Sequence, residues 1–129
     1  MDVIKQKYDL TDLQQYKDFM FEQIDIKTGA LIAAGFAFDA QTFSLSLAAQ
    51  SNWSNIKTNK AVFSGAALFP LQISTIDNNI YMLAEVDVDN FYMAGLTAVK
   101  TAYTGGSDIK KQVFDAVDIA ALDLIEDNR

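Results

Sequence analysis

The chain of 129 residues has the length of one ordinary domain, and half of its residues are apolar. A chain of this size buries roughly two-thirds of the surface that its unfolded form exposes. One proline and six glycines exclude a disordered or collagen-like composition. We therefore predict a single folded domain over residues 1–129.

The charge balance limits the expected partners. Seventeen acidic residues against ten basic ones give a formal net charge of -7. This excess repels phosphate backbones and anionic lipid, so neither nucleic acid nor a membrane is expected as a partner. The sequence shows no secretion signal and no apolar run near the roughly 18 residues that span a bilayer.

The sequence lacks both cysteine and histidine. Their absence removes the thiolate nucleophile, the commonest general base near neutral pH and the commonest ligands of transition metals. Catalysis would have to rest on carboxylates, lysines or tyrosines alone. Since the candidate groups weighed below favour structural interpretations, we expect no enzyme activity, and we assign no catalytic, cofactor-binding or metal-binding residue and no cofactor.

The first predicted helix lies near the N-terminus. Thr11 and Gln14 have the spacing of a capping box, and an apolar stripe at helical spacing follows them. Gly29 is expected to weaken the helix, and Gly35 suits the left-handed position that ends it. Residues 1–10 precede this pattern and are a candidate docking arm.

Two antiparallel hairpins are predicted from alternating apolar residues. In the first, Ala40 and Gln41 form the tip and Asp39 lies opposite Thr42. One face of this hairpin carries four apolar side chains: Phe36, Phe38, Phe43 and Leu45. In the second hairpin, a loop of residues 77–79 pairs three residues with three others: Thr75 with Tyr81, Ile73 with Leu83, and Leu71 with Glu85.

The loop of the second hairpin and the face of its strands follow from this register. Asn79 is expected to take the left-handed conformation. The inner face then carries Leu71, Ile73, Tyr81 and Leu83.

A helix separates the hairpins, and further helices follow them. Ser46 is expected to cap the intervening helix, and residues 59–67 are expected to be a connection. Asp87 caps the next helix, which Gly105 and Gly106 are expected to stop. Two later caps, Ser107 and Asp118, are expected to start the last helical segments.

This order of elements predicts the fold class. The strands arrive in adjacent antiparallel pairs, which favours α+β over a doubly wound fold. We expect an N-terminal helix, two antiparallel β-hairpins separated by a helix, and C-terminal helices packed on the small sheet.

Three groups of polar residues are candidate sites. Asp87, Asp89 and Asn90 match a calcium loop poorly, and helix capping is the preferred interpretation. The glycines of residues 104–107 lack the rest of a phosphate-binding motif. The third group is a set of C-terminal acids that follow the polar side of helices and indicate a solvated face or a surface for a basic partner: Asp115, Asp118, Asp123, Glu126 and Asp127.

Aromatic residues offer two further interpretations. A cluster could line a pocket for a sugar or other small ligand, but the hydrophobic core is the preferred interpretation: Phe36, Phe38, Phe43 and Trp53. Four residues fit no apolar stripe well and are candidates for a subunit interface: Phe19, Phe21, Val62 and Phe63.

A family resemblance is carried by residues 24–53. They begin Ile-Asp-x-Lys-Thr-x-x-Leu-Ile-x-x-Gly-Phe-x-Phe-Asp and end Phe-Ser-Leu-Ser-x-x-Ala-Gln-x-Asn-Trp. The pattern resembles a phage domain of unknown function that is found among tail, tail-fibre and baseplate-region proteins. The likeness continues through residues 69–71, residues 73–75, Tyr81, the Phe91-Tyr92 pair and residues 125–129. Ala40 departs from it, since a glycine is expected at the hairpin tip.

The resemblance implies a non-enzymatic structural protein of the virion. Such a protein would be made in the host cytoplasm and dock other phage structural proteins, in several copies, in the tail, baseplate or connector region. Two alternatives remain: a tail-fibre assembly factor that is absent from the mature particle, and a carboxylate-based hydrolase or small-ligand binder.

Overall fold

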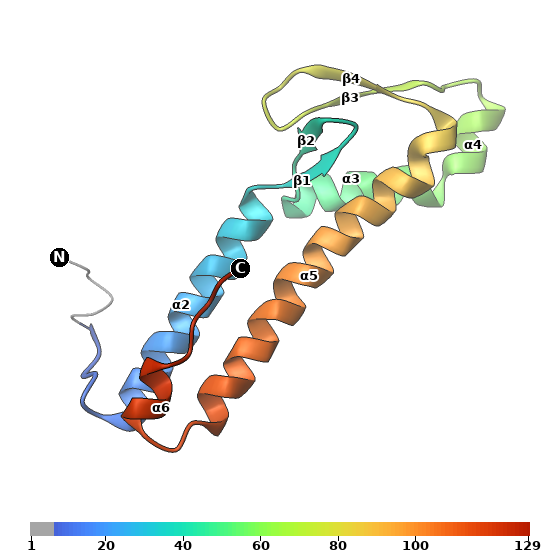
Figure 1. The fold of residues 1–129 in the computed structure, drawn as a ribbon. Helices are drawn as coiled ribbons and strands as arrows, with labels where there is room; N and C mark the ends of the chain where they lie inside the picture. The colour runs from blue at the N-terminus through green and yellow to red at the C-terminus, as the bar shows by residue number, and fades with distance from the viewer. Residues whose placement is uncertain (1–6) are drawn as a thin grey trace. The chain divides into compact units, whose positions relative to one another are not determined.

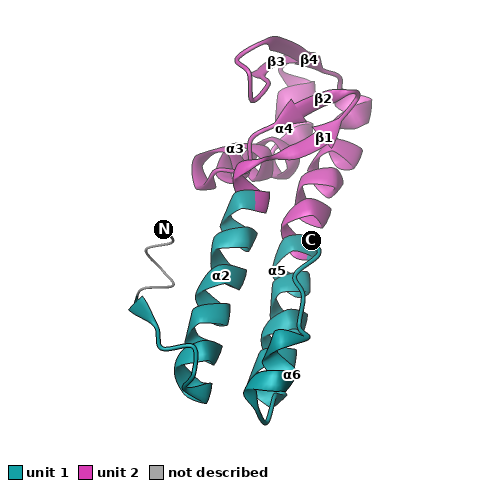
Figure 2. Ribbon diagram, turned by 60° about the vertical axis from the view of Figure 1, so that its left-hand side comes forward, with its two compact units in different colours: residues 1–30, 101–129 teal, residues 31–100 magenta. Residues whose placement is uncertain are grey.

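The computed structural model describes residues 7–129, which belong to two compact units. Unit 1 combines the chain up to residue 30 with residues 101–129, and unit 2 comprises residues 31–100 (Figure 2). Each unit has a hydrophobic cluster of its own. A single domain over the whole chain stays a prediction.

The order of the elements confirms the α+β class (Figure 1). The two hairpins form separate two-stranded antiparallel sheets. In chain order the elements are α2 (Leu13–Ala33), β1 (Phe36–Phe38), β2 (Gln41–Phe43), α3 (Leu47–Thr58), α4 (Lys60–Gly65), β3 (Leu71–Ser74), β4 (Ile80–Leu83), a 3-10 turn (Glu85–Asp87), α5 (Val88–Asp115) and α6 (Ile119–Asp123).

The cap of α2 differs from the predicted one. The side chain of Asp12 accepts a hydrogen bond from Gln15 N at 2.9 Å, and the helix begins one residue after Asp12. The hydroxyl of Thr11 donates instead to Asp9 at 2.6 Å, so it is turned away from the helix. The helix then continues through Gly29 without a break, because tertiary packing outweighs the weak propensity of one glycine.

The predicted docking arm is described only in part. Residues 1–6 lie outside the described residues. Within the described part, the hydroxyl of Tyr8 donates to Glu22 at 2.7 Å, and its ring meets Phe19 edge to face with centroids 6.1 Å apart. This end of the arm therefore contacts α2.

The guanidinium of Arg129 bonds several segments of unit 1, in addition to the hydrophobic cluster of this unit. It donates from Nε and Nη2 to both carboxylate oxygens of Asp127, at 2.8 and 2.7 Å. Nη1 donates to Thr28 Oγ1 at 2.6 Å and to Ala102 O at 2.8 Å, and Nη2 donates to Ile24 O at 3.0 Å. All five N–H groups of the guanidinium are thereby satisfied. Arg129 thus links α2, α5 and the segment that follows α6.

The same arginine explains why α5 does not stop where a helix end was predicted. A Cβ atom on Gly106 would lie 2.8 Å from Nη1 of Arg129 and 2.9 Å from Oγ1 of Thr28. A Cβ on Gly105 would lie 2.9 Å from Cδ of Arg129. The two glycines therefore leave space for the side chain of Arg129 against the surface of α5, which is one continuous helix. The predicted helix end at these glycines and the predicted new helix at Ser107 are wrong.

The tip of the first hairpin is shifted from the predicted one. Phe36 pairs with Phe43, and the turn consists of Asp39 and Ala40, with φ of 49° and 58°. Two consecutive positive φ angles are typical of the tight turn whose twist matches a hairpin. The predicted tip was therefore wrong by one residue, but the face of the hairpin that is buried is the predicted one. Gly35, with φ of 79°, ends α2 as predicted.

The second hairpin is also out of the predicted register. Ile73 pairs with Tyr81, and Asn78 instead of Asn79 has the positive φ, at 63°. Thr75 fixes this turn, because its N–H donates to Asn79 O at 2.8 Å and its Oγ1 accepts from Asn79 N at 3.0 Å. The predicted register was wrong by two residues, a shift that leaves the inner face unchanged.

Unit 2 is centred on aromatic rings. The ring of Phe91, on α5, has four aromatic neighbours with centroids 5.0 to 5.4 Å away: Phe36, Phe38, Phe43 and Trp53. Phe36 and Phe43 are buried, and the other two pack against them. The core interpretation of this cluster is confirmed.

The two predicted helix caps at Ser46 and Asp118 are present, whereas the predicted connection over residues 59–67 is largely helical. Ser46 caps α3 by accepting from Ala49 N at 3.1 Å, and Asp118 caps α6 by accepting from Ala121 N at 2.8 Å, as predicted. Residues 59–67 were expected to be a connection, but most of them form α4, which packs Phe63 against Phe69. A helix of six residues has too few apolar positions to show a helical period.

Replacing Ala40 by glycine should stabilise the protein. Alanine in the left-handed region has a steric cost that glycine avoids, and the gain outweighs the added flexibility of the unfolded chain by about 0.5–1 kcal/mol. The matched control is Ala37→Gly in β1, where φ is not positive. This control should lose about 0.5–1 kcal/mol of stability, because glycine is unfavourable inside a strand. Urea denaturation of both variants gives their free energies of unfolding. An equal loss of stability in the two variants would contradict the assigned turn.

Replacing Gly106 by alanine should destabilise the protein despite the better helix propensity of alanine. The added methyl group displaces Arg129 or Thr28, at a cost of about 1–3 kcal/mol. Gly29→Ala is the control, since no atom lies within 4 Å of the position that its methyl group would take, and a gain of about 1 kcal/mol is expected. Thermal unfolding would refute the role of Gly106 if both alanines stabilised.

Candidate functional site

The four predicted interface residues do not form one patch within either unit. In unit 1, Phe19 lies edge to face with Tyr16, and Phe21 packs against the buried cluster. In unit 2, Phe63 contacts a neighbouring ring, while Val62 is 66% exposed. Their role in an interface stays a prediction, and Val62 has the most side-chain surface available for contact.

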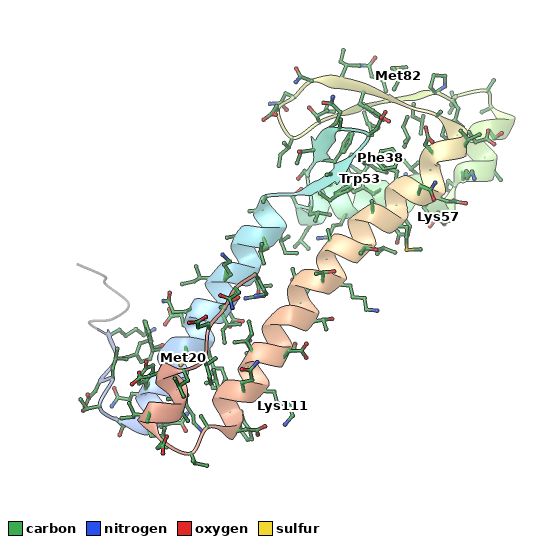
Figure 3. All side chains as sticks on the ribbon, in the orientation of Figure 1. Met20, Phe38, Trp53, Lys57, Met82 and Lys111 are labelled. Atoms are coloured by element: carbon green, nitrogen blue, oxygen red, sulfur yellow. The ribbon has the colours of Figure 1, made fainter. Side chains whose placement is uncertain are left out.

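The outer face of the β3–β4 hairpin exposes apolar side chains that the sequence patterns did not single out. Ile80 is 68% exposed and Met82 is 50% exposed. They lie directly opposite Ser74 and Gln72 of β3. Figure 3 shows Met82 on the side of the hairpin away from Phe38. We call these four residues, Gln72, Ser74, Ile80 and Met82, the outer hairpin face.

The sequence contained a signal for this face. Residues 80–83 are apolar at all four positions, whereas a strand with one solvated face alternates apolar and polar residues. Tyr81 and Leu83 account for the inner face, where Leu83 is fully buried. The remaining two apolar residues therefore had to lie on the opposite face, and the register places them there.

An apolar pocket of about 270 Å³ opens between α3 and α5 in unit 2. Trp53, Phe36 and Phe91 contribute aromatic walls, and Gly95 leaves space beside the ring of Phe36, which a Cβ would approach to 3.4 Å. The indole N–H of Trp53 donates to Ser44 O at 2.9 Å and fixes the ring. The pocket is thus an extension of the core with one open side.

The residues that partly match a calcium loop make other contacts. Asp89 is paired with Lys57 at 2.6 Å and with Lys60 at 3.6 Å. The hydrogen bond from Lys57 is the main reason that the pKa of Asp89 is lowered. Asp87 ends the 3-10 turn, where its N–H donates to Ala84 O at 3.0 Å, so the predicted capped start of α5 is replaced by a continuous turn into the helix.

Three of the C-terminal acids each contact a different partner and do not form a cluster. Asp123 accepts from the hydroxyl of Tyr16 at 2.6 Å, Asp118 is a helix cap, and Asp115 is paired with Lys111 at 2.7 Å.

In unit 2, the hydroxyl of Tyr81 donates a hydrogen bond to Asp39 at 2.8 Å. Desolvation, with this hydrogen bond, raises the pKa of Tyr81 to about 12, so its hydroxyl is a neutral donor near neutral pH.

The described part of the chain contains neither a metal-binding cluster nor a membrane span. Within residues 7–129, no three carboxylates come together as a group that could hold a metal ion. Among the helices of the same residues, none has the length and apolar character needed to cross a membrane. Comparison of the chain with protein-family models, with curated proteins and with solved structures finds no match.

The Asp127–Arg129 pair should make stability depend on acid pH. Hydrogen bonds from Arg129 lower the pKa of Asp127 in the folded state. The stabilisation is therefore complete above the unfolded-state pKa of about 3.9 and is lost as pH falls through the lower folded-state value. Asp127→Asn should lower the melting temperature near neutral pH and flatten its fall in acid.

Glu126→Gln is the control for this measurement, because Glu126 is an exposed neighbour of Asp127. Its melting curve in acid should follow that of the parent protein. An acid limb that is unchanged in Asp127→Asn would show that this carboxylate contributes little to the pH dependence.

Proposed function

We propose that the chain is a non-enzymatic structural protein of a phage particle, placed in the tail, baseplate or connector region, where it docks other virion proteins. The observation that carries the proposal is the outer hairpin face, with Ile80 and Met82 exposed on a strand whose other face is already buried. The phage particle in this proposal is what the resemblance of residues 24–53 to a domain of tail-region proteins implies.

The exposed face favours docking for an energetic reason. Burying apolar surface stabilises a contact by about 25 cal/mol for each Å² removed from water. Single exposed apolar residues are ordinary, but Ile80 and Met82 are adjacent on one face, and Val86, just after β4, is 83% exposed. A protein partner that covers this region would remove an apolar surface that costs free energy in the isolated chain.

The proposal is tested first by mass spectrometry of density-purified particles from the phage that encodes the chain. We expect the protein at a fixed, stoichiometric ratio to the major capsid protein, and this ratio gives its copy number. Absence from particles, together with abundant protein in the infected lysate, would overturn the proposal in favour of the assembly factor.

A charge on the outer hairpin face should prevent incorporation into particles. Met82→Asp places a carboxylate where the partner would bury an apolar side chain, and an unpaired buried charge is strongly unfavourable. Met93→Asp is the matched control, because Met93 is 59% exposed on α5, outside the outer hairpin face. We expect at least a tenfold loss for Met82→Asp alone, about 1.4 kcal/mol. Equal incorporation of both variants would exclude this face as the docking surface.

A further inference from the structure

The backbone of β3 has an edge that β4 does not use. In an antiparallel pair, residues that exchange both backbone hydrogen bonds alternate with residues that exchange none. Thr75 N donates to Asn79 O at 2.8 Å, and bonded pairs recur at every second residue, which places Ile73 in such a pair. The N–H and C=O groups of Gln72 and Ser74 therefore point away from β4.

The C-terminal end of this edge is already paired with another strand. Ile76 N donates to Thr42 O of β2 at 2.8 Å. β2 ends at Phe43, and α3 begins at Leu47. Among the described residues, no backbone hydrogen bond joins the intervening segment to Ser74 or Gln72, although Ser44 and Ser46 of that segment line the same groove. Two N–H donors and two C=O acceptors thus extend an edge on which strand pairing has begun.

A groove of about 660 Å³ runs beside this edge, between β3 and α3. Asn52 and Asn55 line it from α3, Gln72 and Ser74 line it from β3, and Trp53 adds an aromatic surface. The lining contains no charged residue, although 21% of the chain is charged. A charged segment would lose water in this groove without gaining a counter-charge, so the lining selects an uncharged occupant.

We propose that β3 accepts an extended, uncharged segment of a partner protein as an added strand in this groove. The backbone of the segment pairs with Gln72 and Ser74, and alternate side chains point toward Trp53 on α3. The inference rests on the proposed function for the identity of the partner, which is another virion protein. It adds the chemistry of recognition, which is backbone pairing along an open edge.

The test uses blocked synthetic peptides as probes on the full chain. The first probe is acetyl-(Thr-Val)3-amide, which is uncharged and has a high strand propensity. The second has the same sequence with alternate backbone nitrogens methylated, so its side chains remain but its N–H donors on one edge are lost. The third and fourth replace threonine by lysine or by glutamate.

Two readouts together report the strength and the place of binding. Trp53 is the single tryptophan of the chain and lines both the groove and the apolar pocket, so its fluorescence measures the affinity of a probe but does not by itself distinguish the two places. Amide hydrogen exchange reports the backbone directly: we expect protection of Gln72 and Ser74 by about tenfold or more with the first probe. The methylated and charged probes should bind at least about tenfold more weakly.

Proline variants compare the two edges of the hairpin. Ser74→Pro removes an N–H on the groove edge, and Ala84→Pro removes one on the opposite edge, just after β4, where the backbone φ of -75° already suits proline. By the alternation of the ladder, neither N–H bonds the other strand of the hairpin. We expect Ser74→Pro to weaken binding of the first probe about tenfold and Ala84→Pro to leave it within about twofold. Where a proline variant fails to fold, the methylated peptide decides the question on the unchanged protein.

Several results would overturn the inference. They are a lack of saturable binding by the uncharged probe, equal binding of its methylated form, tighter binding of a charged probe, or protection confined to the Met82 edge. Each is independent of the particle measurement. The chain could be found in particles while the peptide fails, which would refute strand addition alone, and absence from particles would refute the proposed function alone.

Discussion

The burial of one phenylalanine ring organises unit 2. Phe91 is 2% exposed and has aromatic rings around it from the first hairpin and from α3. Edge-to-face contacts of this kind add about 0.5–1.5 kcal/mol each beyond the area that they bury. Phe43 extends the cluster to Tyr81 of β4, with centroids 5.2 Å apart. The position of the second hairpin, and therefore of its outer face and open edge, depends on this aromatic packing.

Unit 1 combines a hydrophobic cluster with a largely buried polar interaction. The side chain of Arg129 is only 13% exposed, and a guanidinium removed from water is tolerated because each of its N–H groups has an acceptor. Two of these acceptors are carbonyl oxygens of helices, at Ile24 and Ala102. The arrangement requires close approach to α5, which is why glycine occupies positions 105 and 106. A long-range contact thus determines residues that locally resemble a helix stop.

The sequence predicted what depends on periodicity. The α+β order, the buried faces of both hairpins and the caps at Ser46 and Asp118 follow from spacing and local chemistry, and the structure has them. The registers of the two hairpins were harder to predict from the sequence, because they depend on which residue of each turn takes a positive φ. Ala40 does so without the usual glycine, and Asn78 does so because Thr75 bonds across the turn.

The candidate site was missed for a different reason. The interface residues chosen from sequence were those that fit no apolar stripe, and packing accounts for Phe21 and Phe63. Ile80 and Met82 were overlooked because they belong to a well-formed strand, and a pattern alone does not give the exposure of its second face.

A strand that is apolar at every position is typical of a strand buried on both faces. In β4 the inner positions are covered by the aromatic core and the outer positions are not. Natural proteins usually blunt such an edge or face with charge, yet residues 71–76 and 80–84 contain no charged side chain. The absence of this protection is costly for a hairpin that remains in water, because it favours aggregation. It is consistent with a hairpin whose outer face and free edge are covered by a partner in an assembly.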